Sequence, residues 1–341
     1  MLALRLHPGP RLILHEEPVP APGPGEVLLR VTAVGLCGSD RHWIVEGGIG
    51  DARIDRPIVP GHEFAGVPNS GRFRDRLVAV DPAIPCERCA LCLAGARNLC
   101  LDLPFAGHAQ TDGALRDFMA WPERCLVPMA DGVSSVEAAL VEPLAIAVHA
   151  LDLAGDVAGG RVAVIGCGPI GLLISAVVRA AGAAAIVATD PLEHRRSAAL
   201  SFGATRVEAA TSTGDERPTL LAAIDGPGYD VVFDASGDGP AVDTAVEIAA
   251  PGAQVILVGI PSEERTSFIA GVARRKGLVF KLARRSTPEA FRRAAGLVNA
   301  AALPDLEKLV TLRVPLRDAL RGVDSLVVRD GVKVIVEPGA G

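Results

Sequence analysis

The pattern of apolar and polar positions changes at Gly159-Gly160 and divides the chain into two kinds of segment. Before this point the apolar runs are short and alternate with polar residues, as in residues 26–31, and a stretch rich in proline and glycine precedes them at residues 18–25. Such runs are typical of short antiparallel strands bounded by turns. We therefore expect an all-β opening over residues 1–35.

The rest of this first part is more varied. Residues 43–60 are predicted to form a loop, because Pro57 and Pro60 oppose a helix there. Residues 135–153 predict a helix with Ser134 or Ser135 as its N-cap. The other elements expected here are a strand at residues 77–80 and a strand pair over residues 113–127.

After residue 160 strands alternate with helices. A β-branched run at residues 161–165 is followed by a glycine turn and by an apolar helix at residues 172–181. Further elements are predicted as strand 185–189, helix 192–202, strand 229–233, helix 241–250, strand 254–258, strand 278–281, helices 288–298 and 316–321, and a closing strand 333–336. Alternating strands and helices form a parallel sheet covered on both faces. The expected fold class is α/β, with a β-rich domain beside a doubly wound parallel sheet.

Length and composition narrow the functional classes. A chain of 341 residues exceeds what one core usually supports, so we expect about two domains. With 49% hydrophobic and 22% charged residues it is too apolar for a disordered chain, yet no window approaches the roughly 18 apolar residues of a membrane span. The N-terminus shows no signal core, which favours a cytoplasmic protein. A net charge of -6 without basic runs argues against nucleic acid and favours a small-molecule substrate.

Seven cysteines in a cytoplasmic chain indicate metal ligands or thiols rather than disulfides. Four of them, Cys86, Cys89, Cys92 and Cys100, follow the spacing Cys-x2-Cys-x2-Cys-x7-Cys, which predicts a closed structural zinc site. An iron–sulfur site is the first alternative, although Leu101 stands where ferredoxin motifs carry proline. A nucleic-acid-binding ribbon is disfavoured by the scarcity of charge among the ligands. Cys125 and Cys167 are expected to be small buried hydrophobes.

The glycine turn has the spacing of a dinucleotide-binding fingerprint. It runs Gly166-Cys167-Gly168-Pro169-Ile170-Gly171 between a predicted strand and a predicted helix, the context in which the helix N-terminus binds a pyrophosphate. Asp190 ends the next strand, where a carboxylate accepts hydrogen bonds from the ribose 2′-hydroxyl and so favours NAD. NADP stays open, because His194, Arg195 and Arg196 are cations that a 2′-phosphate could use.

A second candidate metal site involves Cys37, His62 and Glu63. Thiolate, imidazole and carboxylate are the ligand types of Zn²⁺, and three protein ligands leave a fourth position open, as catalytic zinc requires. We therefore expect the reaction centre here.

Taken together, these motifs resemble the zinc-containing medium-chain dehydrogenases over nearly the full chain. The series in order is Cys-Gly-Ser-Asp-x-His, Gly-His-Glu, the four cysteines, Glu142-Pro143 and the nucleotide fingerprint. Within that family, Cys37-Gly38-Ser39-Asp40-Arg41-His42-Trp43, followed by Gly48-Ile49-Gly50-Asp51 and Pro60-Gly61-His62-Glu63, looks most like the polyol (sorbitol and xylitol) dehydrogenases.

The resemblance implies roles for individual residues. Cys37, His62 and Glu63 would hold the catalytic zinc, with Glu142 beside it. Asp40 would orient His62 through its other ring nitrogen. Ser39 would take the substrate hydroxyl proton and pass it, through the nicotinamide ribose, to His42. Zinc would acidify the bound alcohol, and hydride would then pass to the nicotinamide ring.

The resemblance also implies an architecture and an activity. Residues 1–146, completed by 282–341, would form a GroES-like catalytic domain, and residues 147–281 a Rossmann domain that binds NAD, with Gly166, Gly168, Pro169, Ile170, Gly171, Asp190 and Arg195 as its cofactor-binding residues. The activity would be reversible NAD-dependent oxidation of a secondary hydroxyl of a polyol, by a homo-oligomer, tetramer or dimer, that contains one catalytic and one structural zinc per subunit.

Two departures from the family pattern leave the substrate open. The segment at residues 66–73 is shorter than usual, and Leu282-Ala283 stands about where polyol dehydrogenases tend to carry an arginine–tyrosine pair. Threonine or a simple secondary alcohol is the alternative substrate. From other classes, a non-catalytic nucleotide-binding relative would have lost a zinc ligand or relay residue, and a zinc-free quinone reductase would lack Cys37 and the cysteine cluster; this chain keeps all of them.

Overall fold

The computed structural model describes residues 1–9, 11–50, 52–108, 110–211, 216–261 and 265–339. The chain divides into two compact units. Unit 1 comprises Met1–Ala145, Thr287–Ala301 and Asp305–Gly341, and unit 2 comprises Ile146–Ser286 and Ala302–Pro304.

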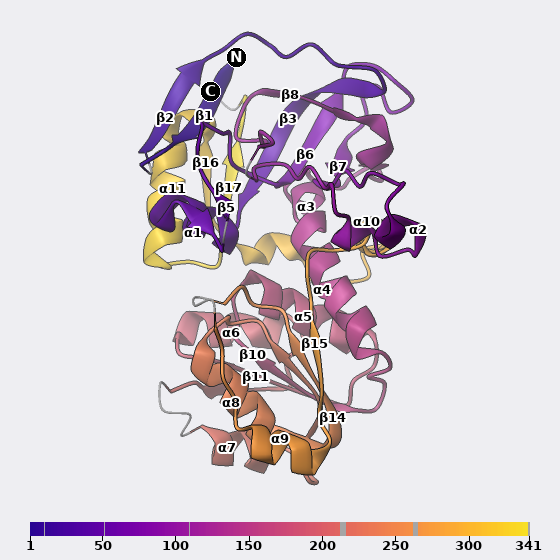
Figure 1. The fold of residues 1–341 in the computed structure, drawn as a ribbon, viewed down its shortest axis with the longest axis vertical. Helices are drawn as coiled ribbons and strands as arrows, with labels where there is room; N and C mark the ends of the chain where they lie inside the picture. Colours follow the sequence, from indigo (N-terminus) through magenta and orange to yellow (C-terminus); the bar gives the residue numbers. More distant parts are fainter. Residues whose placement is uncertain (10, 51, 109, 212–215, 262–264, 340–341) are drawn as a thin grey trace. The chain divides into compact units, whose positions relative to one another are not determined.

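Unit 1 is rich in β-structure (Figure 1). Its strands are β1 Leu2–His7, β2 Arg11–Glu16, β3 Glu26–Leu36, β4 Gly48–Ile49, β5 Ala52–Arg53, β6 Glu63–Pro68, β7 Val78–Val80, β8 Phe118–Pro122, β9 Leu126–Pro128, β16 Val310–Pro315 and β17 Lys333–Glu337. A seven-stranded sheet of the described residues has the order β16-β17-β3-β6-β7-β9, and β8 pairs with β3 beside that path. The all-β opening expected over residues 1–35 is present as β1, β2 and β3, and β1 pairs antiparallel with β2.

Short helices connect these strands. They are α1 Gly38–Glu46, α2 Ala90–Leu93, α3 Ser135–Ala139, α10 Pro288–Asn299 and α11 Ala319–Val328, with 3-10 turns η1 Arg97–Leu99, η2 Glu123–Cys125, η3 Leu306–Leu309 and η4 Leu316–Asp318. Helix α4, Val141–Ala154, begins in unit 1 and continues into unit 2.

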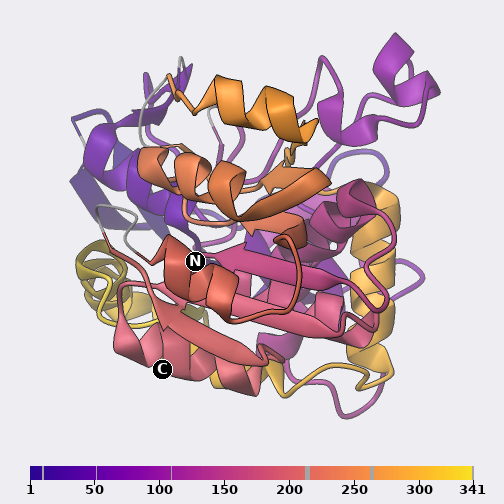
Figure 2. The same cartoon turned by 90° about the horizontal axis from the view of Figure 1, so that it is seen from below.

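Unit 2 contains a six-stranded parallel sheet. Its elements are β10 Arg161–Ile165, α5 Pro169–Ala180, β11 Ala185–Asp190, α6 Glu193–Ser201, β12 Arg206–Ala209, α7 Arg217–Ala222, β13 Tyr229–Asp234, α8 Gly239–Ile248, β14 Ala249–Leu257, α9 Ala270–Lys276 and β15 Val279–Leu282. The strand order is β12-β11-β10-β13-β14-β15. The chain runs outward from β10 to β11 and β12, then returns to β13 on the other side of β10 and continues to β14 and β15. Because each crossover between parallel strands is right-handed, this reversal places helices on both faces of the sheet, as Figure 2 shows. This is the doubly wound order, and ligands bind where it reverses, at the carboxyl ends of β10 and its neighbours.

Three expectations for unit 1 need correction. Residues 43–46 belong to helix α1 rather than to a loop, and the short strands β4 and β5 follow them. Strands β8 and β9 both lie within the predicted pair, but β8 pairs with β3 and β9 with β7, so they do not pair with each other. The helix predicted at residues 135–153 is interrupted at Leu140, and its N-cap is Ser134, whose hydroxyl accepts from the Glu137 amide at 3.1 Å.

Most strands and helices predicted from residue 161 onward are present with small changes of their ends. Two differ more: β14 begins at Ala249 rather than at residue 254, and the helix predicted at residues 316–321 is the turn η4 followed by α11, Ala319–Val328. Five elements of this part were not predicted: β12, α7, α9, β16 and the 3-10 turn η3. The two strands among them lie at sheet edges, where exposed positions weaken the apolar pattern. In the described part of the chain, no helix is long and apolar enough to cross a membrane.

Candidate active site

The first turn of α1 positions the candidate reaction centre. Cys37 is the N-cap of this helix, and its backbone amide donates to Oδ2 of Asp40 at 2.9 Å. The other oxygen of Asp40, Oδ1, lies 3.6 Å from Nδ1 of His62. The fully buried Asp40 thus accepts from the backbone at Cys37 and places a carboxylate oxygen near Nδ1 of His62.

The structure brings Cys37, His62 and Glu63 together. One donor atom from each lies within 4.8 Å of the others. Glu63 opens strand β6, and His62 directly precedes it; β6 pairs with β3 so that Gly35 faces Glu63. The two nitrogens of the His62 ring have different neighbours. Nδ1 lies near the Asp40 carboxylate, and Nε2 lies 3.4 Å from Oγ of Ser39.

This donor set fits a zinc ion. Burial, with the charge of Glu63, raises the pKa of the Cys37 thiol to about 12. Three carboxyl groups, those of Asp40, Glu63 and Glu142, are also buried here. A divalent cation would supply the charge that such a thiol needs to ionise, and these ligand types are those of catalytic zinc.

Glu142 lies near the three ligands in the first turn of α4. It is buried, and its pKa rises to about 8, mainly through desolvation; His62 opposes the shift, and the charges of Glu63 and Cys37 add to it. Glu142 is not part of the three-residue donor group. A carboxyl group with this pKa can hold or release a proton near neutral pH.

His42 lies one turn further along α1. Its Nδ1 is 2.8 Å from Oε1 of Glu46, and its side chain keeps 17% of its surface exposed. Ser39 is on the same helix, so α1 carries a hydroxyl beside His62 and an imidazole that reaches solvent.

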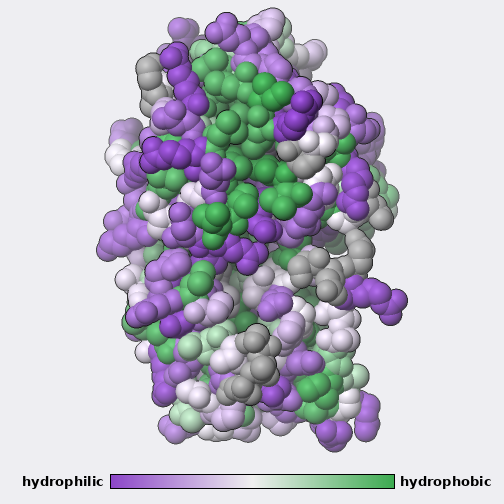
Figure 3. Space-filling view, turned by 90° about the vertical axis from the view of Figure 1, so that its left-hand side faces the viewer, coloured by the Kyte–Doolittle hydropathy of each residue, from purple (hydrophilic) through white to green (hydrophobic). Residues whose placement is uncertain are grey.

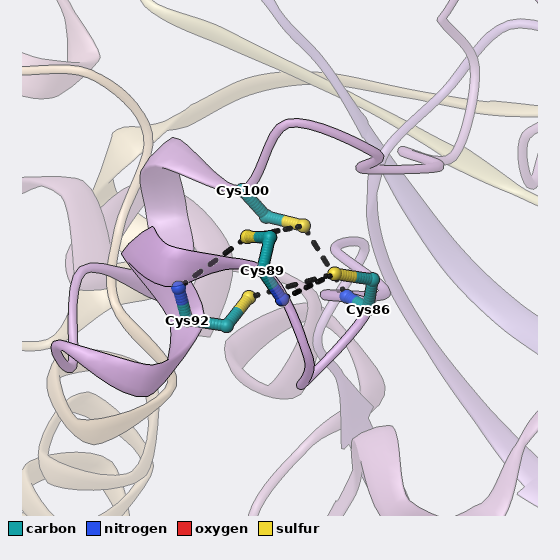
Figure 4. A group of neighbouring side chains, drawn as sticks. All are labelled: Cys86, Cys89, Cys92 and Cys100. Carbon is teal, nitrogen blue, oxygen red and sulfur yellow. Dashed lines mark hydrogen bonds between the residues drawn. The ribbon is translucent and has the colours of Figure 1, made fainter.

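The four clustered cysteines form a separate group in unit 1 (Figure 4). The Sγ atoms of Cys86 and Cys92 are 4.0 Å apart, as are those of Cys89 and Cys100. Tetrahedral zinc with Zn–S bonds of about 2.3 Å separates its sulfurs by about 3.8 Å. Backbone amides of Cys86, Cys89 and Cys92 donate to neighbouring sulfurs at 3.3 to 3.5 Å. The group therefore fits a closed zinc site.

The glycine turn connects β10 to α5 in unit 2. Gly166 adopts φ +94°, and a Cβ on Gly171 would overlap the carbonyl oxygen of Gly166, so both positions require glycine. Gly168 is the N-cap of α5, Pro169 occupies its first turn, and these two residues and Ile170 are half-buried. The helix N-terminus thus remains accessible for a phosphate.

Asp190 ends β11 beside this turn. Its Oδ2 accepts from the Cys167 amide and its Oδ1 from the Leu192 amide, each at 2.9 Å. Each carboxylate oxygen has a further lone pair, so Asp190 can still accept from a ribose hydroxyl. A Cβ placed on Gly168 would lie 4.0 Å from Nη1 of Arg195, which locates the Arg195 guanidinium beside the turn.

Comparison with known proteins agrees with this geometry. Residues 23–131 match the alcohol dehydrogenase GroES-like domain, and residues 169–300 match the zinc-binding dehydrogenase family. A probable D-xylulose reductase A from Neosartorya fischeri is 36% identical over 340 residues, covering 94% of this chain and 92% of the relative. The chain belongs to the zinc-containing medium-chain dehydrogenases.

Solved structures of this family superpose closely on the chain. L-idonate 5-dehydrogenase from Escherichia coli has a TM-score of 0.91 and 26% identity, covering 98% of this chain and 97% of the other. A Sinorhizobium meliloti protein classed with the zinc-binding dehydrogenases, with NADP bound, has a TM-score of 0.87 and 30% identity, with 99% of both chains covered. The GroES-like and Rossmann folds expected from the sequence are confirmed.

Lys333, which contacts the candidate metal site of this dehydrogenase, was not predicted from the sequence. Lys333 Nζ lies 2.8 and 2.6 Å from the two carboxylate oxygens of Glu63 and donates to the Leu36 carbonyl at 3.1 Å. Strand β17 carries it to β3 by antiparallel pairing of Val334 with Leu36. The available signal was a lysine at the start of strand Lys333–Glu337, followed directly by three apolar residues.

Phe105 borders the candidate zinc ligands, and Trp43 lies elsewhere. The Phe105 ring lies 5.5 Å from the His62 ring between centroids, and Trp43 meets His108 edge-on at 4.9 Å. Phe105 therefore borders the metal-ligand group, while Trp43 is buried against β1 and the segment around Ile58.

Proposed function

We propose that the chain is a zinc-dependent, NAD-linked dehydrogenase that oxidises a secondary hydroxyl of a polyol to a ketone, reversibly. The observation that carries the proposal is the buried donor group of Cys37, His62 and Glu63, with the Ser39 hydroxyl 3.4 Å from His62. The substrate class follows from relatives that act on D-xylulose and L-idonate by name.

The geometry supports the following roles, which the resemblance to the family implies. Cys37, His62 and Glu63 would hold the catalytic zinc, which when bound makes an alcohol hydroxyl more acidic. Asp40 holds the His62 ring from its Nδ1 side. Ser39 accepts the hydroxyl proton, and His42 delivers it to solvent. Glu142, whose pKa rises to about 8, stays available as a nearby proton-holding group. NAD⁺, when bound, would accept the hydride that the alcohol loses, so that the overall change gives ketone, NADH and a proton released to solvent.

We further propose that the catalytic domain is residues 1–146 completed by 282–341, and that residues 147–281 bind the cofactor. Gly166, Gly168, Pro169, Ile170 and Gly171 would hold the pyrophosphate, and Arg195 would lie beside it. Asp190 supports NAD, because its carboxylate would repel a 2′-phosphate. The NADP bound to the Sinorhizobium meliloti relative makes NADP the alternative that must be measured.

We also propose a cytoplasmic homo-oligomer, dimer or tetramer. All seven cysteines are unpaired, which suits a reducing compartment. On unit 1, Ile13, Leu14, Leu320 and Val328 are exposed apolar residues, and Figure 3 shows a broad apolar area on this face. On unit 2, the edge strand β15 exposes 73% of Leu282. Such surfaces favour contact with another copy, and light scattering would measure the number of subunits.

The proposal is tested by following NADH formation with zinc-loaded protein on xylitol, sorbitol, L-idonate, L-threonine and 2-butanol, each with NAD and NADP. Turnover that is fastest on a polyol with NAD supports it. Faster turnover of threonine or of the simple alcohol would change the proposed substrate class, but the zinc-dependent oxidation of an alcohol would stand. Absence of turnover on every alcohol, in protein that binds NAD and zinc, would identify a non-catalytic relative instead.

A further inference from the structure

The hydrogen bond between His42 and Glu46 has no role in the mechanism derived so far. Nδ1 of His42 is 2.8 Å from Oε1 of Glu46, a short separation for a nitrogen–oxygen hydrogen bond. The two residues are four apart on α1, so the helix itself keeps them in register. Nη1 of Arg41 lies 3.9 Å from the same Glu46 oxygen.

This contact determines which ring nitrogen of His42 carries a proton. An ionised carboxylate only accepts hydrogen bonds, so the proton of the 2.8 Å bond belongs to Nδ1. A neutral imidazole with its proton on Nδ1 has an unprotonated Nε2, which is an acceptor. A residue that ends a proton relay must present an acceptor when the proton arrives.

We propose that Glu46 is a positioning residue for proton release: it holds His42 in the Nδ1-protonated tautomer and so keeps Nε2 ready to accept the substrate's hydroxyl proton. The proton then leaves from His42 to water, and Glu46 itself neither gains nor loses one. This inference rests on the proposed dehydrogenase function with His42 at the solvent end of the relay.

The location of Glu46 separates this role from a purely structural one. The Glu46 side chain is 49% exposed, and exposed helix pairs contribute little to stability. Helix α1 has other support, since Asp40 bonds the N-cap amide and Gly47 ends the helix at φ +71°. Removing the carboxylate should therefore change the imidazole tautomer without unfolding the helix.

The test compares wild type with Glu46→Ala, Glu46→Gln and, as a matched exposed control, Glu16→Ala, all as full-length zinc-loaded protein. Nitrogen-15 NMR of labelled histidines reads the tautomer, and the spectrum of His42→Gln assigns the His42 signals. We expect Nδ1-protonated His42 in wild type and Glu16→Ala, and a shift toward the Nε2-protonated form in Glu46→Ala. Glu46→Gln, whose amide oxygen also accepts, should restore the wild-type tautomer.

Turnover is measured on the same proteins. We expect kcat for polyol oxidation to fall about tenfold in Glu46→Ala, with KM unchanged. This loss is smaller than the roughly 10²–10⁴-fold rate enhancement that a general acid–base group contributes, because His42 itself is still present. Glu46→Gln should recover most of the lost kcat. Two results would overturn the inference about Glu46 but leave the proposed function intact: a wild-type His42 that is protonated on Nε2, or a kcat that stays unchanged although the tautomer changes. Wild type that turns over no alcohol overturns the proposed function, and the inference with it.

Discussion

The ammonium group of Lys333 contacts both carboxylate oxygens of Glu63, at 2.8 and 2.6 Å, in a pair of which each side chain is only 1% exposed. Burial works against the ammonium charge, but Glu63 outweighs it, so the pKa of Lys333 is raised. Glu63 is thus shared between a lysine and the candidate zinc site. Lys333 neutralises the carboxylate of Glu63, which lies beside the other two candidate ligands, Cys37 and His62.

We predict that Lys333→Met destabilises the zinc-free protein by about 3–5 kcal/mol, because it leaves the Glu63 carboxylate buried without a partner. Zinc would supply a partner, so the loss should be smaller in the zinc-loaded protein. Urea unfolding with and without a chelator measures both, and Lys308→Met, at an exposed position, is the control. Equal losses in the two forms would show that Glu63 does not reach the metal.

Gly35 makes room for this carboxylate. A Cβ at Gly35 would overlap Oε2 of Glu63, whereas a Cβ at Gly38 meets no atom within 4 Å. We therefore predict that Gly35→Ala displaces Glu63 and loses one of two bound zinc ions, while Gly38→Ala retains both. Metal analysis after dialysis gives the result. Two zinc ions retained by Gly35→Ala would argue against Glu63 as a ligand.

Glu142 predicts how the stability of chelator-treated protein depends on pH. Its pKa rises from 4.5 to about 8 on folding, chiefly through burial. Between these values the folded state keeps a proton that the unfolded state releases, so stability falls as pH rises, by at most about 1.4 kcal/mol per pH unit.

Urea midpoints at pH 5, 6, 7 and 8 test this dependence against Glu142→Gln. Other buried acids, such as Asp81 with a pKa near 7, contribute equally to both proteins and cancel in the difference. The wild type should lose its stability relative to Glu142→Gln as the pH rises. A constant difference across the range would contradict the placement of Glu142 in an apolar, acid-rich surrounding.

Sequence patterns sufficed where the signal was local. The β-branched run, the glycine turn and the following helix were predicted because strand, turn and helix are adjacent in the chain. Cys37, His62 and Glu63 were found from ligand chemistry, and the structure brings them within 4.8 Å.

The sequence did not reveal contacts between distant residues or elements whose apolar pattern is weak. Lys333 reaches Glu63 across 270 positions, through pairing of β17 with β3. Helix α1 was not predicted, because its buried residues are Asp40 and Trp43, which do not make an apolar stripe. Strand β12 has exposed residues at both ends, and α9 buries only Ala273, so neither shows a clear period.

The most direct test of the account is zinc content together with turnover in Cys37→Ser. We predict two zinc ions per chain in wild type and one in Cys37→Ser, which should lose polyol oxidation while it still binds NAD. Cys125→Ala, which removes a cysteine outside both clusters, should keep two zinc ions and activity. Two zinc ions or retained turnover in Cys37→Ser would contradict the assignment of Cys37, His62 and Glu63 as the catalytic metal site.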